Sequence, residues 1–113
     1  MDFNEYQKAA TATAQYPNVG KNLVYPAMGL AGEAGEYLDK VKKLWRNRGE
    51  MSDENLTTSE IIEFSKEIGD VLWYAAACAN ELHLSLGDIA DVNIAKLRDR
   101  QARGVIKSSG DNR

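Results

Sequence analysis

Hydrophobic residues recur every three or four positions over four stretches of the chain, which is the pattern of amphipathic helices. The spacing predicts helices over about 3–15, 27–47, 60–84 and 86–103. Their expected N-caps are Asp2, then Thr58 or Ser59, and Ser85. Alternating runs typical of strands are nearly absent. We therefore expect an all-α fold, a four-helix bundle with two long central helices.

Each central helix carries an apolar stripe that we expect to be buried. The stripe of 27–47 consists of Leu30, Ala34, Tyr37, Leu38, Val41, Leu44 and Trp45. The stripe of 60–84 consists of Ile61, Phe64, Ile68, Val71, Leu72, Ala75, Cys78 and Leu82. Together they offer more hydrophobic surface than one chain of 113 residues can readily cover, so we expect a homo-oligomer.

The stretch GLAGEAGEYLDK, residues 29–40, has helical spacing but contains three glycines. A glycine inside a helix costs roughly 1 kcal/mol relative to alanine. Gly29, Gly32 and Gly35 fall along one ridge of the predicted helix. We interpret the missing side chains as room for another backbone, or for a ligand, to approach the neighbouring carboxylates.

Two pairs of carboxylates stand three residues apart on the central helices, Glu33 with Glu36 and Glu67 with Asp70. If the helices are antiparallel neighbours, the pairs form a cup of four acids. Two carboxylates about 5.5 Å apart repel by roughly 3 kcal/mol at an effective dielectric near 20. The acids therefore either diverge into water or bind a divalent cation, and an all-oxygen ligand set suits Mg²⁺ or Mn²⁺.

Composition narrows the classes of function. The net charge of −3 is uneven, since residues 50–95 hold ten acids and one lysine between two basic flanks. This distribution does not suit duplex nucleic acid. With no long apolar run and no basic-then-apolar leader, we expect a cytoplasmic protein without a membrane segment. A single cysteine, Cys78, and a single histidine, His83, exclude an internal disulfide and a multi-cysteine zinc site within one chain.

These motifs resemble the all-α nucleoside triphosphate pyrophosphohydrolases, the MazG-like proteins and their dimeric dUTPase relatives. The resemblance rests on both acidic pairs and on the segments GLAGEAGE, EIGDVLWY, NIAKLRDRQARG and GDNR. It implies a MazG-like domain over residues 1–104 and a C-terminal tail over 105–113. The interval of 30 residues between Glu36 and Glu67 is at the long end of what the family leads us to expect.

The resemblance also implies roles for single residues. Glu33, Glu36, Glu67 and Asp70 would bind Mg²⁺, with Mn²⁺ as an alternative. One carboxylate must also accept a proton, and we expect Glu36 to be this catalytic base because it would lie in the middle of the cup. Water would attack the α-phosphorus of a (d)NTP, releasing the (d)NMP and pyrophosphate, in housecleaning of the nucleotide pool. For contacts with the substrate the resemblance implies Asn93, Lys96, Lys107 and Arg113. Positions relative to the acids add Lys43, Trp45, Trp73 and Tyr74 as candidates, with intrahelical pairing of the lysine and core packing of the aromatic residues as the alternatives. The oligomer would be a homodimer or a tetramer built from two dimers.

Two other functions remain open at this point. One is pyrophosphohydrolysis of a different substrate, such as phosphoribosyl-ATP. The other is a non-catalytic helical interaction module whose acidic face binds a basic partner. The sequence does not indicate which base or sugar an enzyme of this kind would prefer.

Overall fold

The computed structural model describes residues 1–50 and 52–113, and all regular structure in these residues is helical. The predicted all-α fold with two long helices is therefore confirmed. The elements are α1 (Phe3–Thr11), α2 (Val24–Arg48), the 3₁₀ helix η1 (Asp53–Asn55), α3 (Thr58–Glu81) and α4 (Leu86–Ala102). None of the described helices is long and apolar enough to cross a membrane. Met51, in the polar connector expected between the central helices, lies outside the described residues.

The helix starts follow from their caps. Asp2 forms a capping box with Glu5 at the start of α1, and the Ser85 hydroxyl accepts from the Asp88 amide at the start of α4. Helix α3 begins earlier than predicted, because Thr57 rather than Thr58 or Ser59 forms the capping box with Glu60.

Two further boundaries differ from the expected ones. Helix α2 begins three residues before Ala27, so that Pro26 lies in its first turn, where no backbone donor is required. Helix α1 stops at Thr11 rather than Gln15. The chain leaves the helix there because Thr13 accepts a hydrogen bond from the Trp73 indole, which fixes the following loop against α3.

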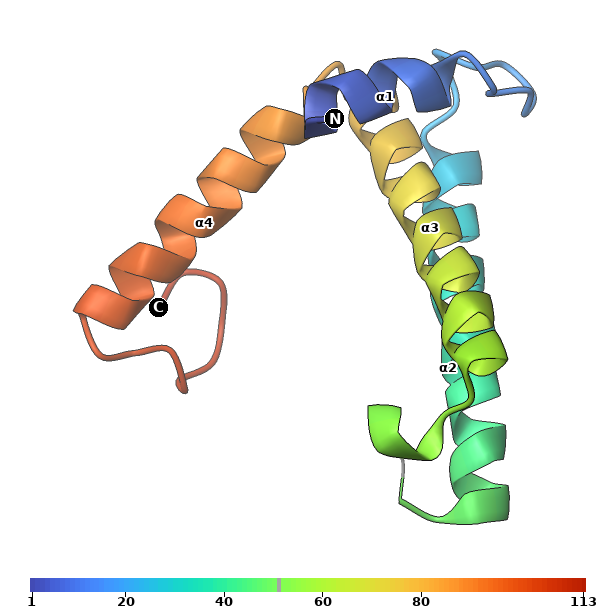
Figure 1. Ribbon diagram of the computed structural model, residues 1–113. Coiled ribbons are helices and arrows are strands. Elements are labelled where there is room, and N and C mark those ends of the chain that lie inside the picture. The colour runs from blue at the N-terminus through green and yellow to red at the C-terminus, as the bar shows by residue number, and fades with distance from the viewer. Residues whose placement is uncertain (51) are drawn as a thin grey trace.

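The four helices form an open arch (Figure 1). Helices α2 and α3 run antiparallel along their length as one leg, α1 crosses the end of α3, and α4 leads away as the other leg. The Cα radius of gyration is 16.9 Å. A compact domain of this length would have about 13 Å. Within one chain, α4 thus stands apart from the α2–α3 pair instead of packing along it.

The largest buried cluster lies at the top of the arch, where α1, α3 and α4 meet. Ala10, Ala76 and Leu86 form its centre, and Tyr6 and Leu72 pack against it. The small side chains of α3 allow α1 to cross closely above them. This junction fixes the direction in which α4 leaves the rest of the molecule.

A buried amide ties the same junction together. The Gln7 side chain donates from Nε2 to Asn80 Oδ1 at 2.8 Å and to the Leu84 carbonyl oxygen at 3.0 Å. Its Oε1 accepts from the Leu86 amide at 2.7 Å. One glutamine of α1 therefore joins the end of α3 to the start of α4.

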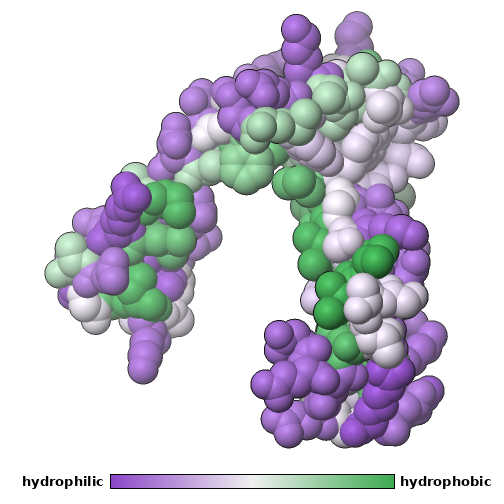
Figure 2. All heavy atoms as spheres, viewed as in Figure 1, coloured by the Kyte–Doolittle hydropathy of each residue, from purple (hydrophilic) through white to green (hydrophobic). Residues whose placement is uncertain are grey.

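Much of the expected core is exposed along the lower part of the α2–α3 leg. Leu38 and Trp45 of α2 and Ile61 and Ile68 of α3 are all exposed, although the helical spacing predicted them to be buried. Figure 2 shows hydrophobic residues gathered along the side of this leg that faces α4. The stripes exist as predicted, but one chain provides nothing to cover this part of them.

The C-terminal segment turns back along α4 instead of extending away. Arg100 is buried and donates from Nη2 to the Asp111 carbonyl oxygen at 2.7 Å. Arg113 donates from Nε to the Val105 carbonyl oxygen at 3.1 Å. Gly104 makes the reversal possible, because its φ of +71° suits glycine.

Candidate metal centre

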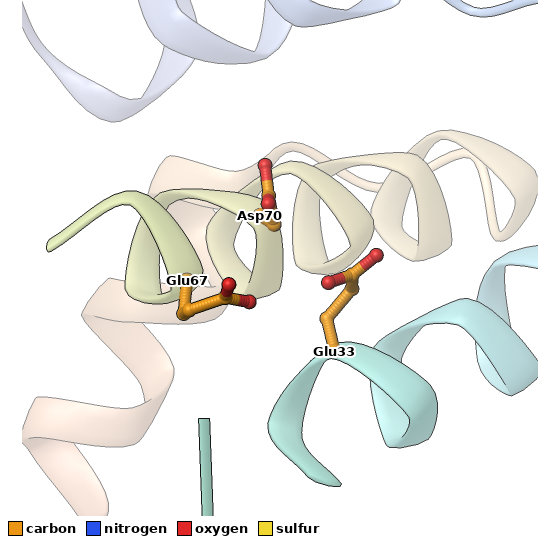
Figure 3. Close-up of side chains that lie close together, drawn as sticks. All are labelled: Glu33, Glu67 and Asp70. Atoms are coloured by element: carbon orange, nitrogen blue, oxygen red, sulfur yellow. The ribbon is translucent and has the colours of Figure 1, made fainter. Parts of the chain in front are cut away.

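Three carboxylates converge where α2 and α3 pack together. Glu33 of α2 and Glu67 and Asp70 of α3 each offer a carboxylate oxygen, and these oxygens all lie within 4.8 Å of one another. Figure 3 shows the Glu33 side chain pointing from α2 toward α3, where Glu67 and Asp70 lie. The antiparallel packing of the two helices therefore brings together three of the four acids that we expected in the cup.

Glu67 is the buried member of this group, with 9% of the residue exposed. Its Oε1 accepts from Lys40 Nζ at 2.6 Å. Its Oε2 is buried and has no hydrogen-bond partner among the described residues. A buried carboxylate oxygen left without a partner is costly, so this atom fits a site that a cation completes.

The charges of the neighbouring acids act on Glu33. Burial raises the pKa of its carboxyl above the ordinary value, and the nearby charges of Glu36 and Asp70 raise it further. Negative charge is therefore unfavourable here unless something positive balances it. The positive charge of Lys40, which pairs with Glu67 and Glu63, balances part of this negative charge.

Glu36 lies at the rim of the group. Its side chain is exposed, and it is close enough to Glu33 to influence that residue's pKa. It does not belong to the set of three converging acids. The structure thus separates a cluster of three carboxylates from a fourth that stands beside it, open to solvent.

An open pocket of about 360 Å³ adjoins the carboxylates. Glu33 and Asp70 form one part of its lining, and Thr13, Trp73 and Tyr74 form the rest. The structure therefore places two of the three aromatic residues that we expected near the substrate beside the acids. Thr13 was not anticipated, because it meets Trp73 across sixty residues of sequence.

Gly29 gives Tyr74 its place in this pocket. A Cβ added at Gly29 would lie 2.1 Å from the Tyr74 ring, so the ring rests against the bare backbone of α2. By contrast, a Cβ at Gly32, Gly35 or Gly69 would meet nothing within 4 Å. Of the three glycines in the 29–40 stretch, only Gly29 is explained by a close contact within the chain.

The loop between α1 and α2 is held over α3 by one carboxylate. Glu81 accepts hydrogen bonds from the Tyr16 hydroxyl and from the amides of Gly20 (2.8 Å) and Asn22 (3.1 Å). The Tyr16 hydrogen bond makes the largest contribution to lowering the pKa of Glu81. A second pocket of about 200 Å³ lies under this loop, and Trp73 lines both pockets.

The structure does not bring the other expected substrate residues to the acids. Lys43 pairs with Asp39 at 2.7 Å. Trp45 is exposed and stands nine residues after Glu36, which is two and a half helical turns and hence the opposite side of α2.

The remaining expected substrate residues belong to the α4 leg. Asn93 and Lys96 line a shallow pocket on α4, and Lys96 also pairs with Asp111 at 3.4 Å. Lys107 is exposed on the tail, and Arg113 holds the tail's own backbone. Their roles toward a substrate stay predictions.

Comparison with known proteins identifies related sequences. The family model described as the MazG nucleotide pyrophosphohydrolase domain matches residues 26–105. The chain is also 44% identical over 118 aligned positions to the "Gene 37 protein" of Mycobacterium phage L5, with both chains covered completely. No solved structure matches this chain. The matched region contains both acidic pairs.

Proposed function

This chain belongs to the MazG nucleotide pyrophosphohydrolase family, and from that premise we propose that it hydrolyses a nucleoside triphosphate to the nucleoside monophosphate and pyrophosphate. We further propose that the reaction depends on Mg²⁺ or Mn²⁺ and that it removes nucleotides from the cellular pool. The pocket beside the acids is open and has two aromatic walls, which suits a substrate carrying both phosphates and a base.

The observation that supports this proposal most directly is the state of Glu67. A buried carboxylate with one oxygen on Lys40 and the other without a partner is not expected of a solvated acidic face. It favours an enzyme site over a helical interaction module, whose acids would point into water. Glu33, Glu67 and Asp70 would hold the cation through oxygen atoms, as Mg²⁺ and Mn²⁺ prefer.

When bound, the cation would lower the pKa of a water molecule and neutralise charge on the phosphates. The residues of the chain would do the rest. Glu36, exposed at the rim, would accept a proton from the attacking water through its carboxylate. Trp73 and Tyr74 would contact the base or the sugar. Lys40 would keep the Glu67 carboxylate oriented toward the cluster.

Two measurements test the proposal. The melting temperature of the protein should rise with added Mg²⁺, and Glu67→Gln should remove that rise, while Asp91→Asn on the exposed surface of α4 should retain it. Nucleoside triphosphates should yield the monophosphate and pyrophosphate without a diphosphate intermediate. Orthophosphate and diphosphate as first products would reject the reaction. If the protein hydrolysed phosphoribosyl-ATP and no nucleoside triphosphate, the alternative substrate would be the correct one.

A further inference from the structure

Trp73 forms a wall that two pockets share, and the loop between α1 and α2 holds its ring. The residue lines both the pocket beside the acids and the pocket of about 200 Å³ under this loop. Its indole Nε1 donates to the Thr13 hydroxyl at 2.8 Å. The Tyr16 ring meets the indole edge to face, with ring centroids 6.5 Å apart. Two residues of the loop therefore fix the orientation of Trp73.

The loop itself, residues 12–23, is fixed to α3 by the Glu81 carboxylate. Its Oε1 accepts hydrogen bonds from the Tyr16 hydroxyl and the Gly20 amide, and its Oε2 accepts one from the Asn22 amide. Glu81 is the last residue of α3, where a negative charge is unfavourable because the helix end already carries partial negative charge. The three donors of the loop offset this cost, since hydrogen bonds to an ionised acceptor are among the strong ones in proteins. The position of Glu81 is therefore explained by the loop and not by the helix.

Tyr16 connects the Glu81 carboxylate with the Trp73 indole. Trp73, Ala77 and Glu81 follow one another at four-residue intervals, so they share one face of α3. All three line the pocket under the loop, and so does Tyr16. The buried Tyr16 side chain places its hydroxyl on Glu81 and its ring against Trp73. A movement of the carboxylate is thus passed to the indole through one buried ring.

Trp73 in turn adjoins the second aromatic wall of the pocket beside the acids. Its ring and the Tyr74 ring meet edge to face, with ring centroids 4.9 Å apart. The Tyr74 ring rests against the backbone of α2 at Gly29, which limits its movement. Of the two aromatic walls, Trp73 is therefore the one whose position depends on the loop.

We propose that Glu81 is a positioning residue of this site: through Tyr16 it holds the Trp73 indole as the surface on which the base of the nucleotide stacks. The proposal rests on the proposed function. Glu81 stands eleven residues after Asp70, which is roughly 16 Å along α3. It is therefore too far away to bind the cation or the phosphates, and its effect should reach the substrate only through the base.

A role in folding alone would give a different result. If Glu81 only stabilised the fold, its loss would reduce the concentration of active enzyme, which lowers the apparent kcat and leaves KM unchanged. A positioning role acts on ligands that carry a base, because stacking on an aromatic ring requires a flat partner. Phosphate ligands without a base should bind as before.

The first test observes Trp73 and needs no activity. The chain has two tryptophans, so in a Trp45→Phe background the tryptophan fluorescence comes from Trp73. Glu81→Ala should shift this emission to longer wavelength and increase its quenching by acrylamide, because the released indole meets water. Asp91→Asn in the same background is the control and should leave both unchanged. Circular dichroism should show the same helicity in all these proteins.

A conservative variant serves the same test if Glu81→Ala fails to fold. Glu81→Gln retains one acceptor oxygen for Tyr16 and Gly20 but presents an amide NH₂ group to the Asn22 amide, which is also a donor. The Trp73 emission should shift in the same direction as in Glu81→Ala, by a smaller amount.

The second test separates the base from the phosphates. Glu81→Ala should raise the KM for a nucleoside triphosphate about tenfold, while kcat stays within about twofold of the parent value. Inorganic tripolyphosphate has no base, so in the presence of Mg²⁺ it should raise the melting temperatures of parent and variant by the same amount. Tyr16→Phe keeps the ring and removes the hydroxyl. Combined with Glu81→Ala it should add nothing to the effect on KM, because both changes break the same link.

Three results would overturn the proposal. Unchanged Trp73 emission in a folded Glu81→Ala or Glu81→Gln protein would show that the carboxylate does not hold the indole. A lower kcat with an unchanged KM, or a smaller effect of tripolyphosphate, would make the role of Glu81 one in folding. Additive effects of Glu81→Ala and Tyr16→Phe would mean that Glu81 does not act through Tyr16. A parent without activity in which the emission nevertheless shifts would reject the proposed reaction but not the link from Glu81 to Trp73, so the two failures are distinguishable.

Discussion

Gly29 and Gly32 lie on one ridge of α2 but in different surroundings, which allows a matched test. A methyl group at Gly29 would collide with the Tyr74 ring, whereas one at Gly32 would meet nothing. We expect Gly29→Ala to lower the melting temperature of the metal-free protein, because overpacking costs about 1–3 kcal/mol and exceeds the helix gain. Gly32→Ala should raise it, by up to roughly 1 kcal/mol of stability. Thermal unfolding measures both changes in melting temperature. Equal changes in the two variants would contradict the close contact of Gly29 with Tyr74.

Glu36 is the residue where activity and stability should separate. Its carboxylate is exposed, so Glu36→Gln should leave the metal-free melting temperature unchanged or slightly higher. Turnover should fall on the order of 10²-fold or more, because a proton acceptor has been lost. Steady-state assays with Asp91→Asn as control measure the effect. An active Glu36→Gln enzyme would assign the base to another group.

At the scale of residues, three-residue spacing on a helix was enough to place each pair of carboxylates on a common face, while their roles stay predictions. It did not predict which three converge, since that depends on how deeply α2 and α3 pack around Glu67. Nor could it predict Thr13, whose partner Trp73 is distant in sequence. Short-range spacing carries no information about such contacts.

At the scale of elements, the connection between α2 and α3 is closed by an ion pair. Arg48 donates from Nη1 and Nη2 to the two carboxylate oxygens of Glu60, both at 2.7 Å. Arg48 is the main cause that lowers the pKa of Glu60 from 4.5 to about 2. The pair thus contributes stability above pH 4.5 and loses it as the pH falls toward 2.

We therefore expect the difference in melting temperature between the parent and Glu60→Gln to shrink between pH 4.5 and 2. Above pH 5 the parent should be the more stable protein. Thermal unfolding across this range, with Asp91→Asn as reference, measures the difference. If the difference in melting temperature instead increased as the pH fell, the ion pair would not be its cause.

The helices themselves were predictable, because caps and apolar periodicity are local. Ser85 and Asp2 were identified as N-caps and are N-caps in the structure. The end of α1 was placed too late, since the helix is cut short by contacts of the following loop with α3. Helix propensity is a local property, so it carries no information about a contact between distant segments.

At the scale of the whole molecule, stability should depend on protein concentration. If the exposed apolar residues of α2, Leu38 and Trp45 among them, join two copies of the chain, a hundredfold rise in concentration adds about 2.7 kcal/mol per dimer and raises the melting temperature by several degrees. Leu38→Glu should unfold at one temperature at every concentration. Calorimetry at protein concentrations that span about a hundredfold range, from about 1 to about 100 µM, would measure this shift. A melting temperature of the parent protein that does not change with concentration would contradict the pairing of two copies.

The arrangement of the helices was less predictable than their number. Apolar periodicity predicted buried faces on α2 and α3 but not whether the same chain would cover them. In the structure Leu38 and Ile68 are exposed, and α4 stands across an open space. The hydrophobic pattern specifies that a face needs a partner, and a single sequence does not reveal which chain supplies it.

Helix α4 is attached to α1 and α3 at its first turn, through the Gln7 amide, the buried Leu86 side chain and a hydrogen bond from the Gly87 amide to Asn4. The hydrogen bonds of Gln7 join α1, α3 and α4 at this end of the helix. A helix of 17 residues is about 25 Å long, so a tilt of roughly 10° at this junction moves its far end by about 4 Å. The far end carries Arg100 and the folded tail. A small change in the packing at this junction would therefore move a distant cluster of positive charge.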